Sequence, residues 1–280
     1  MRSRYILLRT FLHNAVREPF NVTLKKTFFI FICFTDRFYK KPTVVCRVAC
    51  LGEELLGKYK RFSSIKFVNF QKARIDFLLD HENQLHLHQV KALGLQRSNF
   101  GERLFEWIKE LYKVNFWTEL KKSSILIIDT FSELTDSKYL LKSGLPFFCH
   151  NSDVAVLLSK EIEIERNGLY DLKSLKSDYE ELITRVSSDT AVVFIHYSAK
   201  LDYRKFFQQR AKHIEEVLIE ILQDRKNVSL VKLDDSDYHA RESDDFPYHY
   251  GKSTMLKLDK EFSKALQYSG VRKSIVSRWS

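Results

Sequence analysis

The 280-residue chain contains little cysteine, glycine or proline, with only four Cys, eight Gly and four Pro. None of its cysteines is spaced as CxxC, the spacing typical of a structural zinc site or a redox motif. The scarcity of Gly and Pro argues against long disordered linkers. Together these absences indicate an ordered domain from a reducing compartment. The cysteines are Cys33, Cys46, Cys50 and Cys149.

Several motifs that would define a function class are also missing. No GxGxxG or GxxxxGK[ST] follows an expected strand, so a dinucleotide or P-loop phosphate cradle is not indicated. No GxSxG is present, which weakens the case for an ordinary α/β-hydrolase. His86 and His88 are close in sequence, but no HExxH or cysteine cluster accompanies them. We therefore expect no cofactor and no metal.

Long hydrophobic runs are absent as well. Thr27–Phe34 is far too short to span a bilayer. Arg9 interrupts the short apolar run at the start of the chain, so a secretory signal is not indicated. The sequence predicts a cytoplasmic protein without a transmembrane segment. Its basic, aromatic beginning is a candidate for peripheral membrane contact.

Basic residues outnumber acidic ones, 46 to 36, which gives a formal net charge of +10. Such a surface favours phosphates, nucleic acids, anionic lipids or acidic glycans. The charge is spread along the chain, and no compact block of five or more Lys and Arg stands out. This pattern favours a solvated basic surface over a nucleic-acid footprint.

Apolar runs predict the strands. Lys26–Phe34, Ser123–Thr130 and Thr190–Tyr197 are almost continuously apolar, as expected for strands buried on both faces of a parallel sheet. We expect these three to be adjacent central strands. Asn227–Leu233 is a shorter strand with an alternating pattern, and Thr43–Cys50 gives a weaker strand signal.

Helical patterns lie between the strands, at Asn99–Val114, Leu172–Val186, Asp202–Gln223 and Thr254–Tyr268. Residues 71–95 and 142–169 look irregular and are expected to be insertions over the sheet. Alternating strands and helices predict an α/β fold, here a three-layer α/β/α sandwich with a mostly parallel sheet. Residues 25–280 would form one domain, and residues 1–24 an N-terminal extension. In the strongest helix, the side facing the sheet is expected to carry Phe207, Ala211, Ile214 and Leu218.

Polar residues follow each expected strand. In an open α/β sheet, ligands bind beyond the carboxyl ends of the strands, so these residues are candidates for a site. The last strand is followed by "DDFPYHY", Asp244–Tyr250, in which a histidine lies between two tyrosines. The candidates are Cys33, Thr35, Asp36 and Arg37 after the first strand, Asp129, Thr130, Ser132 and Glu133 after the second, His196, Tyr197, Ser198 and Lys200 after the third, and Asp234 and Asp235 after the fourth.

Three stretches, Ser123–Leu134, Val192–Ile221 and Phe246–Phe262, carry a resemblance to a known family. Together they resemble an uncharacterised bacterial family of SGNH-hydrolase-like proteins associated with surface-polysaccharide genes. The likeness covers roughly the last three-fifths of the chain and implies an SGNH/flavodoxin-like fold. It also implies an esterase or acyltransferase that acts on a carbohydrate or acylated glycan, with His249 as base and Asp245 or Asp244 orienting it. Substrate-binding candidates are Arg37, Asp129, Glu133, His196 and Lys200.

The first strand departs from the pattern of this family, which ends that strand in Gly-Ser-Cys-x-Thr-Arg-Asp. Laid on Phe31–Thr35, the pattern puts Ile32 at the nucleophilic serine. An isoleucine cannot attack a carbonyl, so three alternatives stay open: a catalytically dead protein, an alignment that is one strand off, or substitution by Cys33 or Thr35. The family's Asp three residues before the histidine is also missing, since Phe246 stands there.

Three functions are compatible with these residues. The first is an SGNH-like esterase or acyltransferase, and the second is a degenerate member of the same fold that binds a glycan or a partner. The third is a glycosyltransferase-like enzyme of polysaccharide assembly, which would hold a sugar nucleotide through Lys, Arg and the acidic strand ends. A hydroxyl or thiol within reach of His249 distinguishes the first from the second. A diphosphate pocket with basic side chains would favour the third.

Overall fold

The computed structural model describes residues 43–57, 60, 65–80, 102–141, 144–150, 164–223, 225–242 and 246–268. The chain divides into two units, Met1–Lys41 and Pro42–Ser280, and every described residue belongs to the second. The strand predicted at Lys26–Phe34 and the extension predicted at residues 1–24 lie outside the described residues.

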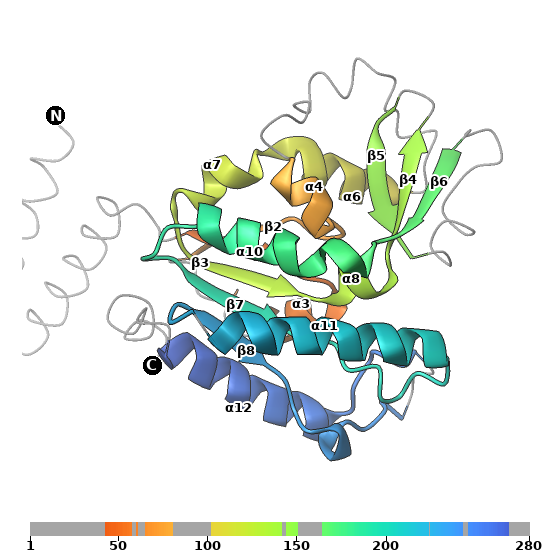
Figure 1. The fold of residues 1–280 in the computed structure, drawn as a ribbon, viewed down its shortest axis with the longest axis vertical. Coiled ribbons are helices and arrows are strands. Elements are labelled where there is room, and N and C mark those ends of the chain that lie inside the picture. The colour runs from red at the N-terminus through yellow and green to blue at the C-terminus, as the bar shows by residue number, and fades with distance from the viewer. Residues whose placement is uncertain are drawn as a thin grey trace, which may run out of the picture. The chain divides into compact units, whose positions relative to one another are not determined.

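A five-stranded parallel sheet forms the centre of the second unit, in the order β2-β1-β3-β7-β8. The strand β3 runs from left to right in Figure 1, so the carboxyl edge of the sheet lies on the right of that view. The strands are β1 (Thr43–Arg47), β2 (Lys66–Asn69), β3 (Ser123–Asp129), β7 (Ala191–Ile195) and β8 (Val228–Val231).

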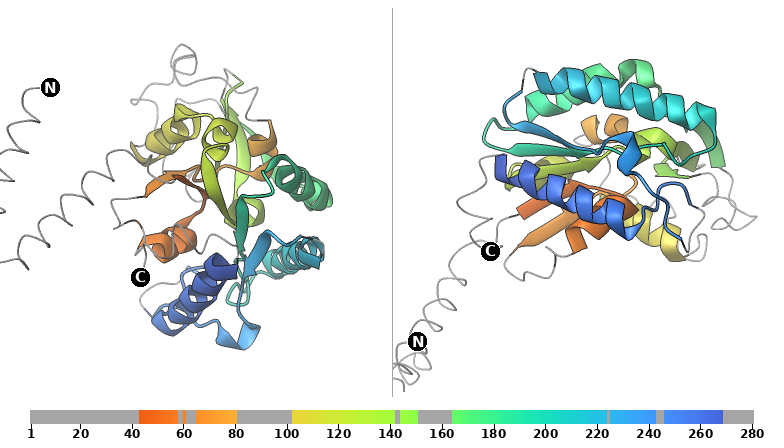
Figure 2. Two further views of the ribbon diagram at one scale, coloured as in Figure 1. Left: turned by 90° about the vertical axis from the view of Figure 1, so that its left-hand side faces the viewer. Right: turned by 90° about the horizontal axis from the view of Figure 1, so that it is seen from below.

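Helices cover both faces of this sheet (Figure 2). One face carries α3 (Cys50–Gly57) and α12 (Lys252–Tyr268), and the other carries α4 (Ile75–Leu79), α10 (Leu175–Arg185) and α11 (Lys205–Gln223). The predicted three-layer α/β/α sandwich is confirmed. Two further helices, α6 (Glu102–Lys113) and α7 (Phe116–Leu120), precede β3, and the short α8 (Phe131–Thr135) follows it.

The predicted strand at Thr43–Cys50 is present as β1, and it changes the expected strand order. β1 and β7 occupy the two sides of β3, and β3 and β8 occupy the two sides of β7. The described strands next to β3 are therefore β1 and β7, and the strand predicted at Lys26–Phe34 lies outside the described residues. The β1 signal was weak because the strand is short and ends in Arg47, a charged side chain that is completely buried here.

A second, antiparallel sheet was not predicted. It has the order β5-β4-β6 and lies beyond the carboxyl edge of the main sheet, at the upper right of Figure 1. Its strands are β4 (Ser137–Leu141), β5 (Pro146–Cys149) and β6 (Ile164–Leu169). The expectation that residues 142–169 are irregular is wrong for β5 and β6. Both strands are short, and a glycine with positive φ precedes β5 (Gly144) or lies within β6 (Gly168). The irregular segment expected at 71–95 likewise contains α4.

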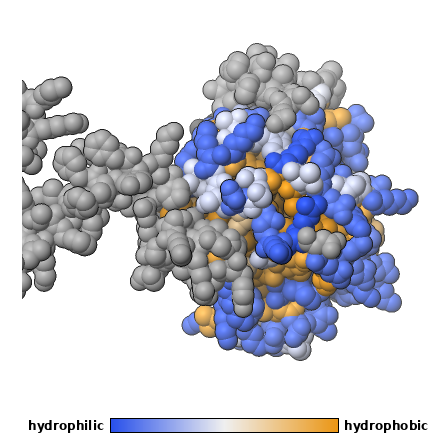
Figure 3. Space-filling model, turned by 60° about the vertical axis from the view of Figure 1, so that its left-hand side comes forward, coloured by the Kyte–Doolittle hydropathy of each residue, from blue (hydrophilic) through white to orange (hydrophobic). Residues whose placement is uncertain are grey.

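Among the described residues, no helix is long and apolar enough to cross a bilayer. Figure 3 shows one face of the molecule on which hydrophilic side chains surround smaller hydrophobic areas. The apolar residues of the strands are instead gathered in the core between the layers, where β1 and β7 are buried along their whole length.

Leu218→Ala is expected to lower the free energy of unfolding by about 2–5 kcal/mol. Leu218, Ala211 and Ile214 are buried on the sheet side of α11, as predicted, while Phe207 is partly buried against the core. Removing the Leu218 side chain leaves a cavity that the close-packed layers cannot fill. Denaturant melts of both proteins measure the loss, and a value under about 1 kcal/mol would show that this face is misassigned.

Candidate functional site at the carboxyl edge of the sheet

The strand order identifies one place where a ligand crevice is expected. The chain passes from β1 outward to β2 and then returns to β3 on the opposite side of β1. In doubly wound folds, ligands bind at this switch point, beyond the carboxyl ends of the two strands that flank it. Here those ends are the start of α3, which follows β1, and the start of α8, which follows β3.

The turn from β1 into α3 is held by side chains at or just beyond the carboxyl ends of β2, β3 and β7. Val48 donates its N–H to Asn69 Oδ1 (3.0 Å), Ala49 donates to Asp129 Oδ2, and Leu51 donates to the Tyr197 hydroxyl (2.6 Å). These bonds satisfy N–H groups that a helix start otherwise leaves without partners. Cys50, the first residue of α3, lies in the middle of this hydrogen-bonded turn and is exposed.

A glycine allows the close approach of this turn to β3. A Cβ atom on Gly52 would lie 2.4 Å from Val48 Cβ and 3.2 Å from Asp129 Oδ2. The first distance is far below van der Waals contact, so a larger residue would push α3 away from the strand end. The position of Cys50 therefore depends on this glycine.

Arg47 and Glu133 form a fully buried ion pair next to the switch point. Arg47 Nη2 lies 2.8 Å from Glu133 Oε2, and both side chains are 0% exposed. Glu133 also accepts hydrogen bonds from the Ile75 N–H (2.9 Å) and the Tyr179 hydroxyl (3.1 Å). The pair thus joins the end of β1 to α8, α4 and α10.

Asp129, at the end of β3, is also fully buried. It accepts the N–H groups of Ala49 and Phe131, and burial raises its pKa to about 7 in spite of the positive charge of Arg47. Asp129 and Glu133 were predicted to bind substrate, but the structure places both carboxylates in internal contacts. Their role in this conformation is to hold the backbone of the site.

Two tyrosines attach the stretch Phe246–Tyr250 to the residues that follow β7. The Tyr248 hydroxyl donates to Asp202 Oδ2 (2.7 Å), and the Tyr250 hydroxyl donates to the Ser198 carbonyl (2.7 Å). Both rings lie against Tyr197, with centroids 6.1 and 6.5 Å away. Tyr197 therefore contacts this stretch and also accepts the N–H of Leu51 in α3.

His249 lies in this fastened stretch and is half-buried. Its N–H donates to the Phe246 carbonyl (3.0 Å), its carbonyl accepts the N–H of Arg241 (3.1 Å), and its ring lies 4.8 Å from the Phe246 ring. The structure thus places His249 at the carboxyl edge. The other predicted catalytic residues, Cys33, Thr35, Asp244 and Asp245, lie outside the described residues, as does Arg37.

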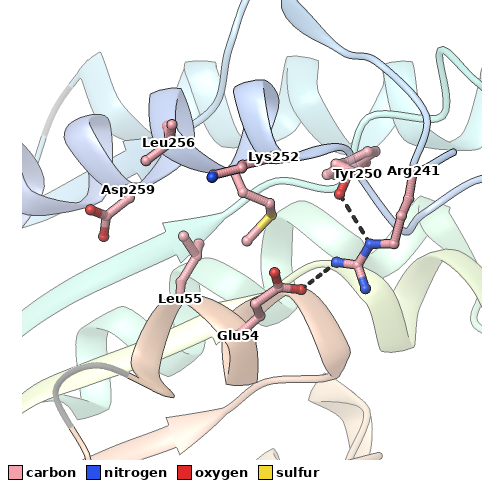
Figure 4. Close-up of a pocket in the computed structure, with 8 residues that line it drawn as sticks. Glu54, Leu55, Arg241, Tyr250, Lys252, Leu256 and Asp259 are labelled. Carbon is pink, nitrogen blue, oxygen red and sulfur yellow. Dashed lines mark hydrogen bonds and ion pairs between the residues drawn. The ribbon is translucent and has the colours of Figure 1, made fainter. Parts of the chain in front are cut away.

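A cavity of about 410 Å³ opens between α3 and α12 beside this site (Figure 4). Glu54 and Arg241 form an ion pair across it (2.6 Å), and Arg241 Nε donates to the Tyr250 carbonyl (3.4 Å). Sequence reasoning missed both residues, because they are 187 positions apart and neither belongs to a motif. The remaining walls are Leu55, Lys252, Met255, Leu256 and Asp259.

His196 and Lys200, two of the predicted substrate-binding residues, lie on the opposite side of β7. His196 is 2% exposed, its Nδ1 is 3.4 Å from Thr130 Oγ1, and its Nε2 is 3.7 Å from Glu215 Oε2. Lys200 is exposed. Both line a second cavity, against α11. Tyr197 instead contacts α3, because consecutive residues of an extended chain point to opposite sides.

His196→Gln is expected to reduce the acid sensitivity of the fold. Burial lowers the pKa of His196 from 6.5 to about 4, with Glu215 and Asp235 opposing this shift and Lys232 adding to it. Since the unfolded chain then binds more protons between pH 6.5 and 4, the stability that neutral His196 contributes is lost as pH falls through this window. Urea melts of both proteins at pH 7 and pH 4.5 measure the effect. If both proteins lose the same free energy of unfolding between pH 7 and pH 4.5, this role of His196 is contradicted.

No family model matches this chain, and no curated protein matches its sequence. Among the described residues, no group of three or more His, Cys, Asp or Glu side chains is placed to hold a metal ion. A function therefore has to be inferred from the geometry of the carboxyl edge together with the resemblance in the motifs.

Proposed function

We propose that this protein cleaves or transfers an acyl ester of a carbohydrate, with Cys50 as nucleophile and His249 as base. The observation that carries the proposal is the position of Tyr197, which binds the start of α3 and packs against the stretch that holds His249. An exposed thiol and a half-buried imidazole are thereby held at the same edge of the sheet, at the switch point.

The strand order favours the alternative in which the family pattern belongs at the end of β1, one strand later than Lys26–Phe34. Laid on the end of β1, Gly-Ser-Cys falls on Val48, Ala49 and Cys50. The serine position is then held by Ala49, whose methyl group cannot attack. The cysteine position is kept by Cys50, which is exposed at the start of a helix, where the positive end of the helix dipole favours a thiolate.

The proposed reaction follows from these two groups. His249 takes the proton of the Cys50 thiol, and the sulfur attacks the ester carbonyl carbon. The C–S bond forms, the C–O bond breaks, and the sugar hydroxyl leaves with the proton that the imidazole gained. Water, or the hydroxyl of an acceptor sugar, then attacks the thioester, which restores the thiol and releases the acid or the new ester.

The cavity between α3 and α12 suits an acylated sugar. Leu55 and Met255 give it an apolar wall, while the Glu54–Arg241 pair offers an acceptor and donors for hydroxyl groups. Glu54 is four residues beyond Cys50, one turn along the same helix. A sugar bound there would bring its ester close to the thiol.

Acetate release from O-acetylated sugars tests this function. We expect the protein to release acetate from acetylated mono- and oligosaccharides faster than the spontaneous rate, and we expect no stabilisation by sugar nucleotides. Release at the spontaneous rate from all of them would reject the esterase. Thermal stabilisation by a sugar nucleotide would favour the glycosyltransferase-like alternative instead.

A second candidate is a non-catalytic member of the same fold that binds a glycan. Two observations favour it: Ala49 stands at the serine position of the family, and the Asp129 and Glu133 carboxylates are engaged in internal contacts. Binding of acetylated sugars without turnover would support this candidate.

A further inference from the structure

The cavity beside His196 is a second polar chamber, separate from the site at Cys50. It has a volume of about 560 Å³ and lies between the carboxyl end of β7 and α11. The end of β7 separates it from α3, since Tyr197 faces α3 while the preceding His196 faces α11. Its polar walls come from His196, Ser198, Lys200, Glu215 and Asp235.

The hydrogen bonds around His196 indicate which ring nitrogen carries the proton. Thr130 Oγ1 accepts the N–H of Tyr197 (2.9 Å), so its own proton is available to His196 Nδ1, 3.4 Å away. Burial keeps the imidazole neutral near pH 7, because its pKa falls to about 4. This arrangement favours the tautomer in which Nδ1 accepts from Thr130 and Nε2 carries the proton and faces Glu215 in the cavity.

The gap between His196 and Glu215 fits one bridging oxygen atom. Nε2 and Oε2 are 3.7 Å apart, too far for a hydrogen bond with each other. An oxygen about 2.8 Å from each would complete a triangle, accept the Nε2 proton and donate to the carboxylate. A hydroxyl group can do both at once, whereas a phosphate or carboxylate oxygen would meet the Glu215 charge.

The remaining groups extend this pattern of donors and acceptors. Ser198 Oγ donates to Asp235 Oδ1 over a long 3.4 Å, and the ammonium of Lys200 has no ion-pair partner among the described residues. The lining carries the acids Glu215, Glu216 and Asp235 against the lysines Lys200 and Lys212. Lys232, which lies outside the lining, neutralises Glu215 through an ion pair, so the charges of the chamber sum to zero when this pair is counted. A neutral ligand suits it better than an anion.

We propose that the chamber lined by His196, Ser198, Lys200, Glu215 and Asp235 binds one neutral sugar unit, on the face of the sheet opposite to Cys50. Each hydroxyl of a sugar both donates and accepts, which matches carboxylates that only accept and an imidazole and an ammonium that donate. This binding site goes beyond the proposed ester chemistry and does not depend on it.

Saturation-transfer NMR on the full chain with D-glucose, D-galactose and N-acetyl-D-glucosamine tests the site, with inorganic phosphate as competitor. We expect at least one sugar to bind, and Glu215→Gln and Lys200→Ala each to weaken it about tenfold, the worth of one charge-assisted hydrogen bond. Lys205→Ala, an exposed lysine outside the chamber, is the matched control and should bind normally.

Three results would overturn the proposal: no sugar bound at 50 mM, unchanged binding in both chamber variants, or displacement of the sugar by phosphate. A failure of the proposed ester chemistry would give results different from these three. Sugar binding should be unchanged in Cys50→Ala, and Glu215→Gln should hydrolyse p-nitrophenyl acetate at the wild-type rate. Loss of sugar binding in Cys50→Ala would mean that the two sites are one, against the proposal.

Discussion

Arg47→Met is expected to lower the free energy of unfolding by about 3–5 kcal/mol, the usual cost of removing one partner of a buried ion pair. The substitution leaves the Glu133 carboxylate buried with only the Ile75 N–H and the Tyr179 hydroxyl as donors. Methionine has a similar length, so little volume is lost. Urea denaturation at pH 7 measures the change.

Lys113→Met is the matched control for this substitution. Lys113 pairs with Glu110 on the outer side of α6, where the side chains are 54% and 47% exposed. Such a pair contributes about 1 kcal/mol or less. Arg47→Met combined with Glu133→Gln should recover part of the stability, because the buried charge is then removed. Equal losses for Arg47→Met and Lys113→Met would show that the buried pair does not hold the turn.

Cys50→Ala is expected to lower kcat/KM for an acetylated sugar by about 10³-fold or more, since loss of a nucleophile removes the covalent path. Cys50 is exposed, so the fold should tolerate the change with a stability loss of about 0.5 kcal/mol or less. His249→Gln should give a loss of similar size, because an amide cannot take the thiol proton. Steady-state assays of acetate release measure both.

His213→Gln is the control for the histidine variant. His213 is exposed on α11 and takes no part in the site, so its replacement should leave kcat/KM unchanged. Cys50→Ala with more than half of the wild-type activity would exclude the thiol as nucleophile. Full activity in His249→Gln would exclude His249 as the base. The Cys50 thiol would then have to be activated by another base.

The central strands could be predicted because their signal is local. Ser123–Asp129 and Ala191–Ile195 are continuous apolar runs, and burial on both faces requires this pattern. β1 gave a weak signal because it ends in Arg47, whose charge is neutralised by Glu133 on another element. The apolar run Lys26–Phe34 gives a stronger local signal for the first strand, and the family pattern laid on its end puts Ile32 at the serine position.

The candidate site could be predicted only as an edge of the sheet. Strand ends gave the right neighbourhood for Asp129, His196 and His249, but not their accessibility. Asp129 is buried and accepts the N–H of Ala49, a residue that lies 80 positions earlier in the sequence. His196 and Tyr197 point to opposite sides, as the alternation of an extended chain predicts, but the sequence does not tell which helix each of them faces. The accessibility and the surroundings of each side chain depend on its tertiary contacts, which the sequence does not show.

Mapping the acyl group on the protein is the most direct test of the proposed chemistry. The protein is mixed briefly with p-nitrophenyl acetate or an acetylated sugar, quenched in acid and digested, and its peptides are analysed by mass spectrometry. We expect one acetyl group on the peptide that contains Cys50, and none in Cys50→Ala. Ester hydrolysis with no adduct on Cys50, or with the adduct on another residue, would contradict the assignment of Cys50 as the nucleophile.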